Sequence, residues 1–156
     1  MLLLAVAPLV AQAPVVIPIP AQLSTAQTAF VANAGGPDNY LNQIAYKSLY
    51  QALLNWKHFQ LATRPADAEL SFELTTSQRS GPTLTAHTVL ELNIRDIKTQ
   101  NLLWSFTEPV NSAATPMASD FASVASKLIA DYNGLISGTL LSEPAPKKMR
   151  FSEEKK

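Results

Sequence analysis

Two histidines are the first residues that could do chemistry, because an imidazole ring titrates near neutral pH and binds metal ions. His58 follows a stretch with helical spacing, and His87 lies within a stretch that alternates polar and apolar residues. The two are not at a His-x-His or His-x-x-x-His spacing, so a zinc site would need ligands from scattered strands. The sequence therefore favours two solvated or hydrogen-bonded histidines and predicts no metal site.

Three glutamates, Glu69, Glu73 and Glu91, fall on the same polar strand face as His87. Paired carboxylates can perform acid–base catalysis when their surroundings separate their pKa values. An open sheet face offers little burial for such a shift, and Arg95 would form cross-strand ion pairs there instead. No nucleophile-elbow serine or phosphate-binding glycine loop is present. We expect no catalytic, cofactor-binding or metal-binding residue. The alternative is a small enzyme or ligand carrier with a site between sheet and helices, using His87 and nearby glutamates.

Residues 67–75 alternate strictly between polar and apolar side chains. This pattern indicates the kind of strand that carries Glu69 and Glu73. Successive side chains of a strand point to opposite faces, and such a pattern is typical of an antiparallel sheet with one wet face. The predicted apolar face comprises Ala68, Leu70, Phe72 and Leu74, and the polar face comprises Asp67, Glu69, Ser71, Glu73 and Thr75. Residues 84–96 and 102–107 continue the pattern, with turns at 79–82 and 96–101. We expect Leu84, Ala86, Leu90, Leu92, Ile94, Leu102, Trp104 and Phe106 to face the core.

Two stretches have the three- and four-residue spacing of an amphipathic helix. The first stripe is Leu41, Ile44, Ala45, Leu49, Ala52, Leu53 and Trp56, and the second is Phe121, Val124, Ala125, Leu128, Ile129, Tyr132, Leu135 and Ile136. Short strands are expected at 28–33 and 59–62, joined through the first helix by a parallel crossover. The order β-α-β-β-β-β-α predicts an α+β two-layer sandwich, in which two helices cover one face of a mostly antiparallel sheet of about five strands.

Composition limits the class of protein. The 16.9 kDa chain has 12 basic and 12 acidic residues, so it lacks the basic excess of a nucleic-acid-binding protein, and it has no cysteine. The apolar run at 1–13 ends in a small-x-small pattern and predicts a signal peptide rather than a transmembrane span. We expect a proline-rich extended linker at 14–26, a single domain at 27–140 and a disordered charged tail at 141–156.

Three short motifs accompany this order of elements: Ala66-Asp67 at the opening of a long strand, Asp96-x-Lys98-Thr99 at a turn, and Leu103-Trp104 just after it. With them, the chain resembles small secreted bacterial envelope domains of the type of the TolB N-terminal domain and curli-secretion components. The resemblance implies a periplasmic or extracellular location and a binding or assembly role, and it carries over no catalytic residue.

We therefore expect a non-enzymatic envelope domain. Its polar sheet face, with Ser71, Thr75, Thr85, Ser105 and Thr107, would meet a partner protein or a glycan. The sequence leaves the partner's identity and the oligomeric state open.

Overall fold

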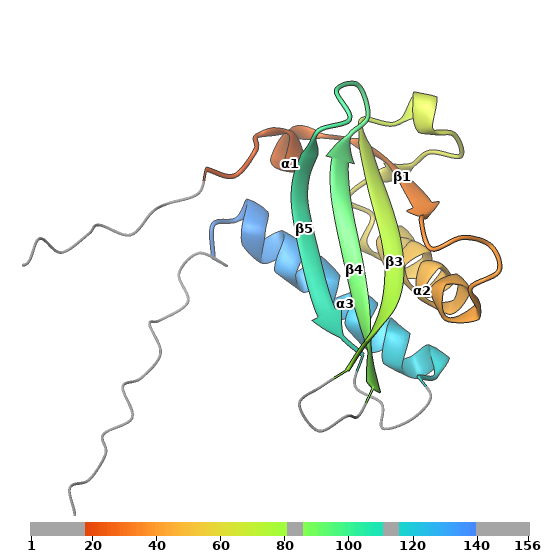
Figure 1. Cartoon of the computed structure of the whole chain (residues 1–156). Helices are drawn as coiled ribbons and strands as arrows, with labels where there is room; N and C mark the ends of the chain where they lie inside the picture. The colour runs from red at the N-terminus through yellow and green to blue at the C-terminus, as the bar shows by residue number, and fades with distance from the viewer. Residues whose placement is uncertain (1–17, 81–85, 111–115, 140–156) are drawn as a thin grey trace, which may run out of the picture.

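Two long helices cover one face of a five-stranded sheet in the computed structural model of the chain (Figure 1). The structure describes residues 18–80, 86–110 and 116–139. The strands lie side by side in the order β2-β1-β3-β4-β5. Along the chain, a strand, a helix, a short strand, three long strands and a helix follow one another. The predicted α+β two-layer architecture is therefore confirmed.

The sheet is mixed. Its strands are β1 (Thr28–Asn33), β2 (Gln60–Leu61), β3 (Leu70–Ser80), β4 (Ala86–Asp96) and β5 (Leu102–Pro109). The last three form an antiparallel meander, whereas β1 runs parallel to both of its neighbours, β2 and β3. The predicted parallel pairing of the first two strands is confirmed, and β1 also joins them to the meander.

Local sequence explains where the long helices begin and end. The helices are α1 (Gln22–Thr25), α2 (Tyr40–Trp56) and α3 (Ala118–Ile136), with a short 3₁₀ helix η1 (Pro65–Asp67). Asn39 precedes α2, and its side-chain oxygen accepts a hydrogen bond from the Asn42 N–H at 3.1 Å, as an N-cap does. Gly138 follows α3 with a φ of 75°, a conformation that glycine adopts without strain and that stops a helix.

The core lies between the sheet and the two long helices. The predicted helical stripes and strand face meet there, and their fully buried members include Leu49, Leu53, Leu70, Phe72, Leu74, Leu90, Ile94, Phe121, Leu128 and Leu135. Because each layer is apolar on one side only, burying the two sides together removes both from water.

The N-terminal end of the described chain differs from the extended linker expected at 14–26. Residues 22–25 form α1, and Leu23 is completely buried in the common core. The hydroxyl of Tyr132 on α3 donates a hydrogen bond to the Leu23 carbonyl at 2.6 Å. A single helical turn gives no repeating apolar pattern, so alternation and periodicity could not indicate it. Residues 1–17 and 140–156, which include the expected signal peptide and tail, lie outside the described residues.

The expected position of Leu102 in the core is wrong. A β-bulge interrupts the pairing of β4 and β5 between Ile94 and Arg95, so that Leu102 pairs with Arg95 while Trp104 pairs with Ile94. An extra residue in one strand shifts the alternation by one position. Leu102 therefore lies on the side of Arg95 and is 51% exposed.

Candidate binding surface

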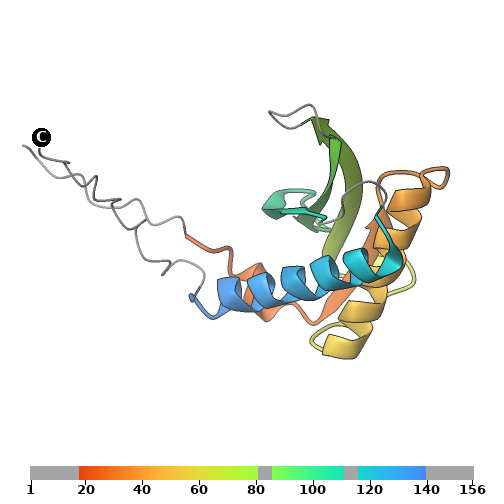
Figure 2. The same ribbon diagram turned by 90° about the horizontal axis from the view of Figure 1, so that it is seen from below.

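The helices cover only one side of the sheet, and the other side is free of any further element of the described chain (Figure 2). We call it the outer sheet face. Strand register assigns to it Phe30, Ala32, Ser71, Glu73, Thr75, Ser77, Arg79, His87, Val89, Glu91, Asn93, Arg95, Leu102, Ser105 and Thr107. The predicted Ser71, Thr75, Ser105 and Thr107 are thus brought together, whereas Thr85 and Leu84 lie outside the described residues.

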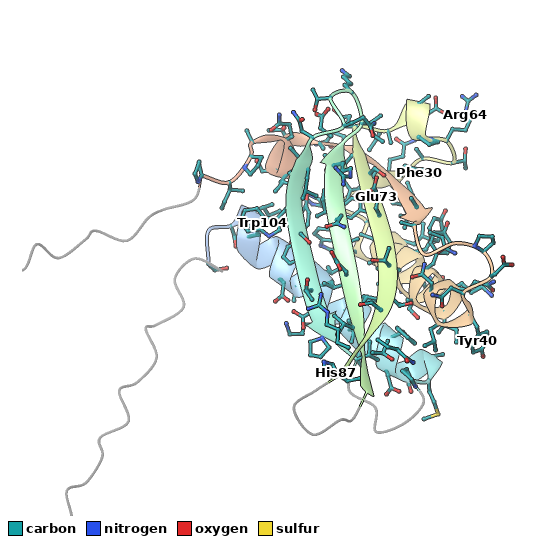
Figure 3. All side chains as sticks on the ribbon, in the orientation of Figure 1. Phe30, Tyr40, Arg64, Glu73, His87 and Trp104 are labelled. Carbon is teal, nitrogen blue, oxygen red and sulfur yellow. The ribbon has the colours of Figure 1, made fainter. Side chains whose placement is uncertain are left out.

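One ion pair organises the middle of the outer sheet face. The Arg95 Nε of β4 contacts the Glu73 Oε2 of β3 at 2.8 Å, and each side chain is about one-third exposed. Arg95 also donates a hydrogen bond to the carbonyl of Gln100 in the turn between β4 and β5. Two bonds from one guanidinium restrict its orientation beside Glu73, whose side chain is labelled in Figure 3.

Glu69 does not join this group. It precedes β3, and its Oε2 accepts hydrogen bonds from the backbone N–H of Gln27 at 2.7 Å and of Thr28 at 3.1 Å. These backbone hydrogen bonds hold the pKa of Glu69 below its ordinary value. The carboxylate therefore secures the start of β1 against β3 and is not available as a general acid near neutral pH.

His87 and the other predicted acidic residues are widely separated. His87 lies opposite Arg79 near the start of β4, and Glu91 follows four residues later, about 13 Å along the strand. Glu73 lies opposite Asn93, about 20 Å along β4 from His87. General acid–base catalysis requires groups within hydrogen-bonding reach of one reacting atom, and this spacing does not provide it.

The interior between sheet and helices is filled mainly by apolar side chains. A cavity of about 10 Å³ lies there, lined by Leu49, Leu53, Trp56, Phe72, Leu92, Leu128, Ile129 and Tyr132. That volume is no larger than a single water requires, and the lining contains neither His87 nor a glutamate. The alternative site between sheet and helices is therefore not formed by the residues expected to form it.

His58 follows α2 and packs among aromatic rings. Its exposed ring stacks on Trp56, with ring centroids 4.5 Å apart and an interplanar angle of 15°. Phe59 meets its edge, with the two rings at 90°. Within the described ranges, no three His, Cys, Asp or Glu side chains are grouped as a metal ion would need.

Three hollows lined by described residues lie at the margins of the molecule. The first, of about 190 Å³, is lined by Gln22, Thr25, Ala26, Glu69, Leu70, Asp96 and Lys98. A hydrogen bond from the backbone N–H of Thr99 holds the pKa of Asp96 below its ordinary value. The second, of about 380 Å³, separates the end of β5 from α3, and the third, of about 500 Å³, separates α2 from α3. Both carboxylates of the first hollow are already bonded to the backbone, so it has structural rather than ligand-binding chemistry.

Two features of the structure were missed from the sequence. Asn42 is completely buried on α2, and its amide donates hydrogen bonds to the Asn33 side chain and, at 3.2 Å, to the Leu74 carbonyl. Gly35 passes so close that a Cβ there would collide with this amide. The sequence did indicate this burial, because Asn42 precedes Ala45 by three residues, which is a spacing of the apolar stripe.

The second feature is Val89. It lies on the outer sheet face and is nevertheless only 4% exposed, between Ser77 and Pro109.

In the part of the chain that the structure describes, no helix is long and apolar enough to cross a membrane. Comparison with known proteins gives no match to a protein-family model and none to a curated protein.

The solved structures to which the chain is similar include the following three, all at low identity. Two are the PelC dodecamer from Paraburkholderia phytofirmans, one as a point variant. The variant has a TM-score of 0.46 and 15% identity over 68% of this chain and 85% of that one. The other form has a TM-score of 0.45 and 16% identity over 70% and 86%. The third, a homolog of a neuraminyllactose-binding hemagglutinin from Helicobacter pylori, has a TM-score of 0.44 and 13% identity over 75% and 89%. These scores are low, so the inferences below rest on the residues of this chain.

Proposed function

We propose that the chain is a non-enzymatic binding domain of the cell envelope that receives a partner protein on its outer sheet face. The observation that carries the proposal is the asymmetry of the sheet. One face is covered by α2 and α3, while the other presents polar and apolar side chains from four strands without any covering element of the described chain.

The composition of this face has two features of a protein interface. Arginine and aromatic residues are enriched in protein interfaces and lysine is depleted, and the face carries Arg95 and Phe30. The lysines that the structure describes, Lys47, Lys57, Lys98 and Lys127, all lie elsewhere.

Binding on this face would immobilise few flexible side chains. Serine, threonine and alanine lose little rotamer entropy when they are buried. Glu73 and Arg95 are long, but their ion pair at 2.8 Å already restricts them before a partner arrives. Such preorganisation lowers the entropic cost of association, which otherwise consumes much of the interaction free energy.

A protein suits this surface better than a glycan. Small ligands bind in concave sites that cover most of their surface. The hollows at the margins are lined by residues outside the middle of the outer sheet face, where Glu73 and Arg95 lie. Neither Glu73 nor Arg95 lines any of these three hollows, and an extended sheet face matches the extent of a protein interface.

An envelope location is part of the proposal. It is supported by the apolar run at 1–13, by the absence of cysteine and by the resemblance to secreted envelope domains. Mass spectrometry of the protein recovered from fractionated cells tests it, since export predicts removal of this run and recovery outside the cytoplasm. Intact residues 1–13 in the cytoplasmic fraction would contradict it.

Site-specific photo-crosslinking in cells tests the binding face. A benzophenone amino acid in place of Thr75, in the middle of the outer sheet face, should give a discrete adduct with one partner protein. The matched control carries the same group in place of Gln51, an exposed position on α2. Adducts at Gln51 but not at Thr75 would place binding on the helical side and refute the proposal.

A glycan partner would give a different result. No protein adduct would form from Thr75, but purified protein would bind a glycan array and Thr75→Lys would abolish that binding. If neither protein adduct nor glycan binding depends on Thr75, the outer sheet face is not the binding surface.

A further inference from the structure

Glu91 carries an uncompensated charge on the outer sheet face. It lies on β4, directly opposite Thr75 of β3 and Thr107 of β5. Among the described residues, its carboxylate forms neither an ion pair nor a side-chain hydrogen bond, and its side chain is only half-buried. In the single chain, contact with water therefore stabilises this charge.

The cations of the outer sheet face do not compensate Glu91. Arg95 lies four residues further along β4, and its guanidinium contacts Glu73 at 2.8 Å. His87 lies four residues from Glu91 in the other direction, about 13 Å along the strand, with Arg79 opposite it. Figure 3 shows the separation of His87 from Glu73 along the face. The part of the face between these ends thus holds two carboxylates and one guanidinium.

A protein bound on this face would remove Glu91 from water. Because Glu91 lies opposite Thr75, a partner that covers the middle of the face covers the carboxylate as well. A charge that is buried without an opposite charge costs several kcal/mol, and interfaces avoid this cost by placing opposite charges across from each other. The hydroxyls of Thr75 and Thr107 are neutral and do not balance the charge. The partner itself therefore has to supply the cation.

We propose that the partner protein presents a lysine or arginine side chain to Glu91, and that this contact selects the partner. The inference rests on the proposed function, because it requires a protein on the outer sheet face. A protein with an acidic side chain at this position is rejected, since like charges across an interface repel each other. Glu91 is thus a residue for specificity, whereas the ion pair of Glu73 with Arg95 is internal to the domain.

Photo-crosslinking from Ser105 in the full chain tests this role of Glu91 in cells. Ser105 is exposed on β5, opposite Asn93, so a benzophenone amino acid there leaves Glu91 and the two threonines opposite it unchanged. Glu91→Gln keeps the size of the side chain and removes its charge, and it should lower the yield of the discrete adduct about tenfold. Glu91→Lys should abolish the adduct. Both variants should melt within a few degrees of the wild type, because the carboxylate forms no bond within the described fold.

Asp38→Asn and Asp38→Lys are the matched controls. Asp38 is exposed in the loop between β1 and α2, so these variants make the same changes in net charge outside the sheet. They should give the wild-type yield of adduct. An equal loss of adduct in the Asp38 variants would show that net charge governs capture, and it would overturn the role of Glu91.

Salt distinguishes a cation from neutral donors on the partner. In envelope extracts, the yield of the wild-type adduct should fall as salt rises, and the yield of Glu91→Gln should fall less, because one charge of the pair is gone. The same salt dependence in both proteins would show that neutral groups meet Glu91, and it would refute the cationic contact.

The two proposals fail with different results. If Thr75 and Ser105 both give adducts and the Glu91 variants leave the yield unchanged, the outer sheet face is the binding surface and the contact with Glu91 is refuted. If neither position gives an adduct in the otherwise unchanged chain, the binding face and the contact are both refuted.

Discussion

Replacing Leu23 by alanine tests whether the segment before β1 is part of the folded domain. Leu23 is completely buried against the core, although it belongs to a helix of only four residues. The substitution removes three carbon atoms, which corresponds to about 2.4 kcal/mol of lost transfer free energy. The remaining cavity adds to that, so the expected loss of unfolding free energy is about 2–4 kcal/mol.

The matched control is Leu54→Ala on α2. The same atoms are removed from a side chain that is 44% exposed, so the expected loss is below about 1 kcal/mol. Urea unfolding followed by tryptophan fluorescence measures both variants, because Trp56 and Trp104 contact the core. A thermal midpoint lowered by on the order of 10 °C should accompany the larger loss.

A Leu23→Ala variant that unfolds at the wild-type urea concentration would refute this reasoning. It would mean that α1 is held only locally and that the domain starts at β1. Tyr132→Phe separates the two contributions of the segment. It removes only the hydroxyl that donates to the Leu23 carbonyl and should cost about 1–3 kcal/mol, since a buried acceptor loses its partner.

Three further predictions concern polar side chains. Joint replacement of His58 and His87 by glutamine should leave the thermal midpoint within a few degrees and partner capture unchanged, and loss of capture with folding intact would contradict a binding role without histidine chemistry. Asn42→Ala should lower the unfolding free energy measured in urea by about 1–3 kcal/mol, whereas the exposed Asn55→Ala should change it little. The pKa of Glu69 is lowered in the folded state, so its contribution to stability is present above its ordinary value of 4.5 and is lost as pH falls through the folded pKa. Glu69→Gln should therefore flatten the acid limb of a stability–pH curve, and an unchanged limb would show that these hydrogen bonds do not stabilise the fold.

Long, regular patterns predicted most of the fold. Ala68, Leu70, Phe72 and Leu74 alternate without interruption, and every one of them is buried as predicted. The stripe around Leu128 repeats over several helical turns and is buried in the same way. Over such lengths many positions must agree, so a few exceptions do not hide the period.

The parts that sequence could not predict depend on single residues or on contacts between distant ones. A bulge changes the orientation of Leu102 without altering the polar and apolar pattern that precedes it. Leu23 is buried because it joins the core that α3 and the sheet form, which a segment of four residues cannot indicate. The candidate surface was predicted as a polar face, but the ion pair of Arg95 with Glu73 rather than Glu91 required the register of the two strands.

The position of β1 has a consequence for the order in which the chain folds. The meander of β3, β4 and β5 consists of neighbours in sequence, so its contacts close short loops and can form early. Strand β1 must instead wait for β3, since Thr28 and Glu69, which hydrogen-bond to each other, are 41 residues apart. A chain that emerges N-terminus first would hold β1 unpaired until most of the domain has followed it. We therefore expect the docking of β1 between β2 and β3 to be the late step of folding, and the step at which an unfolded chain is most exposed to wrong pairing.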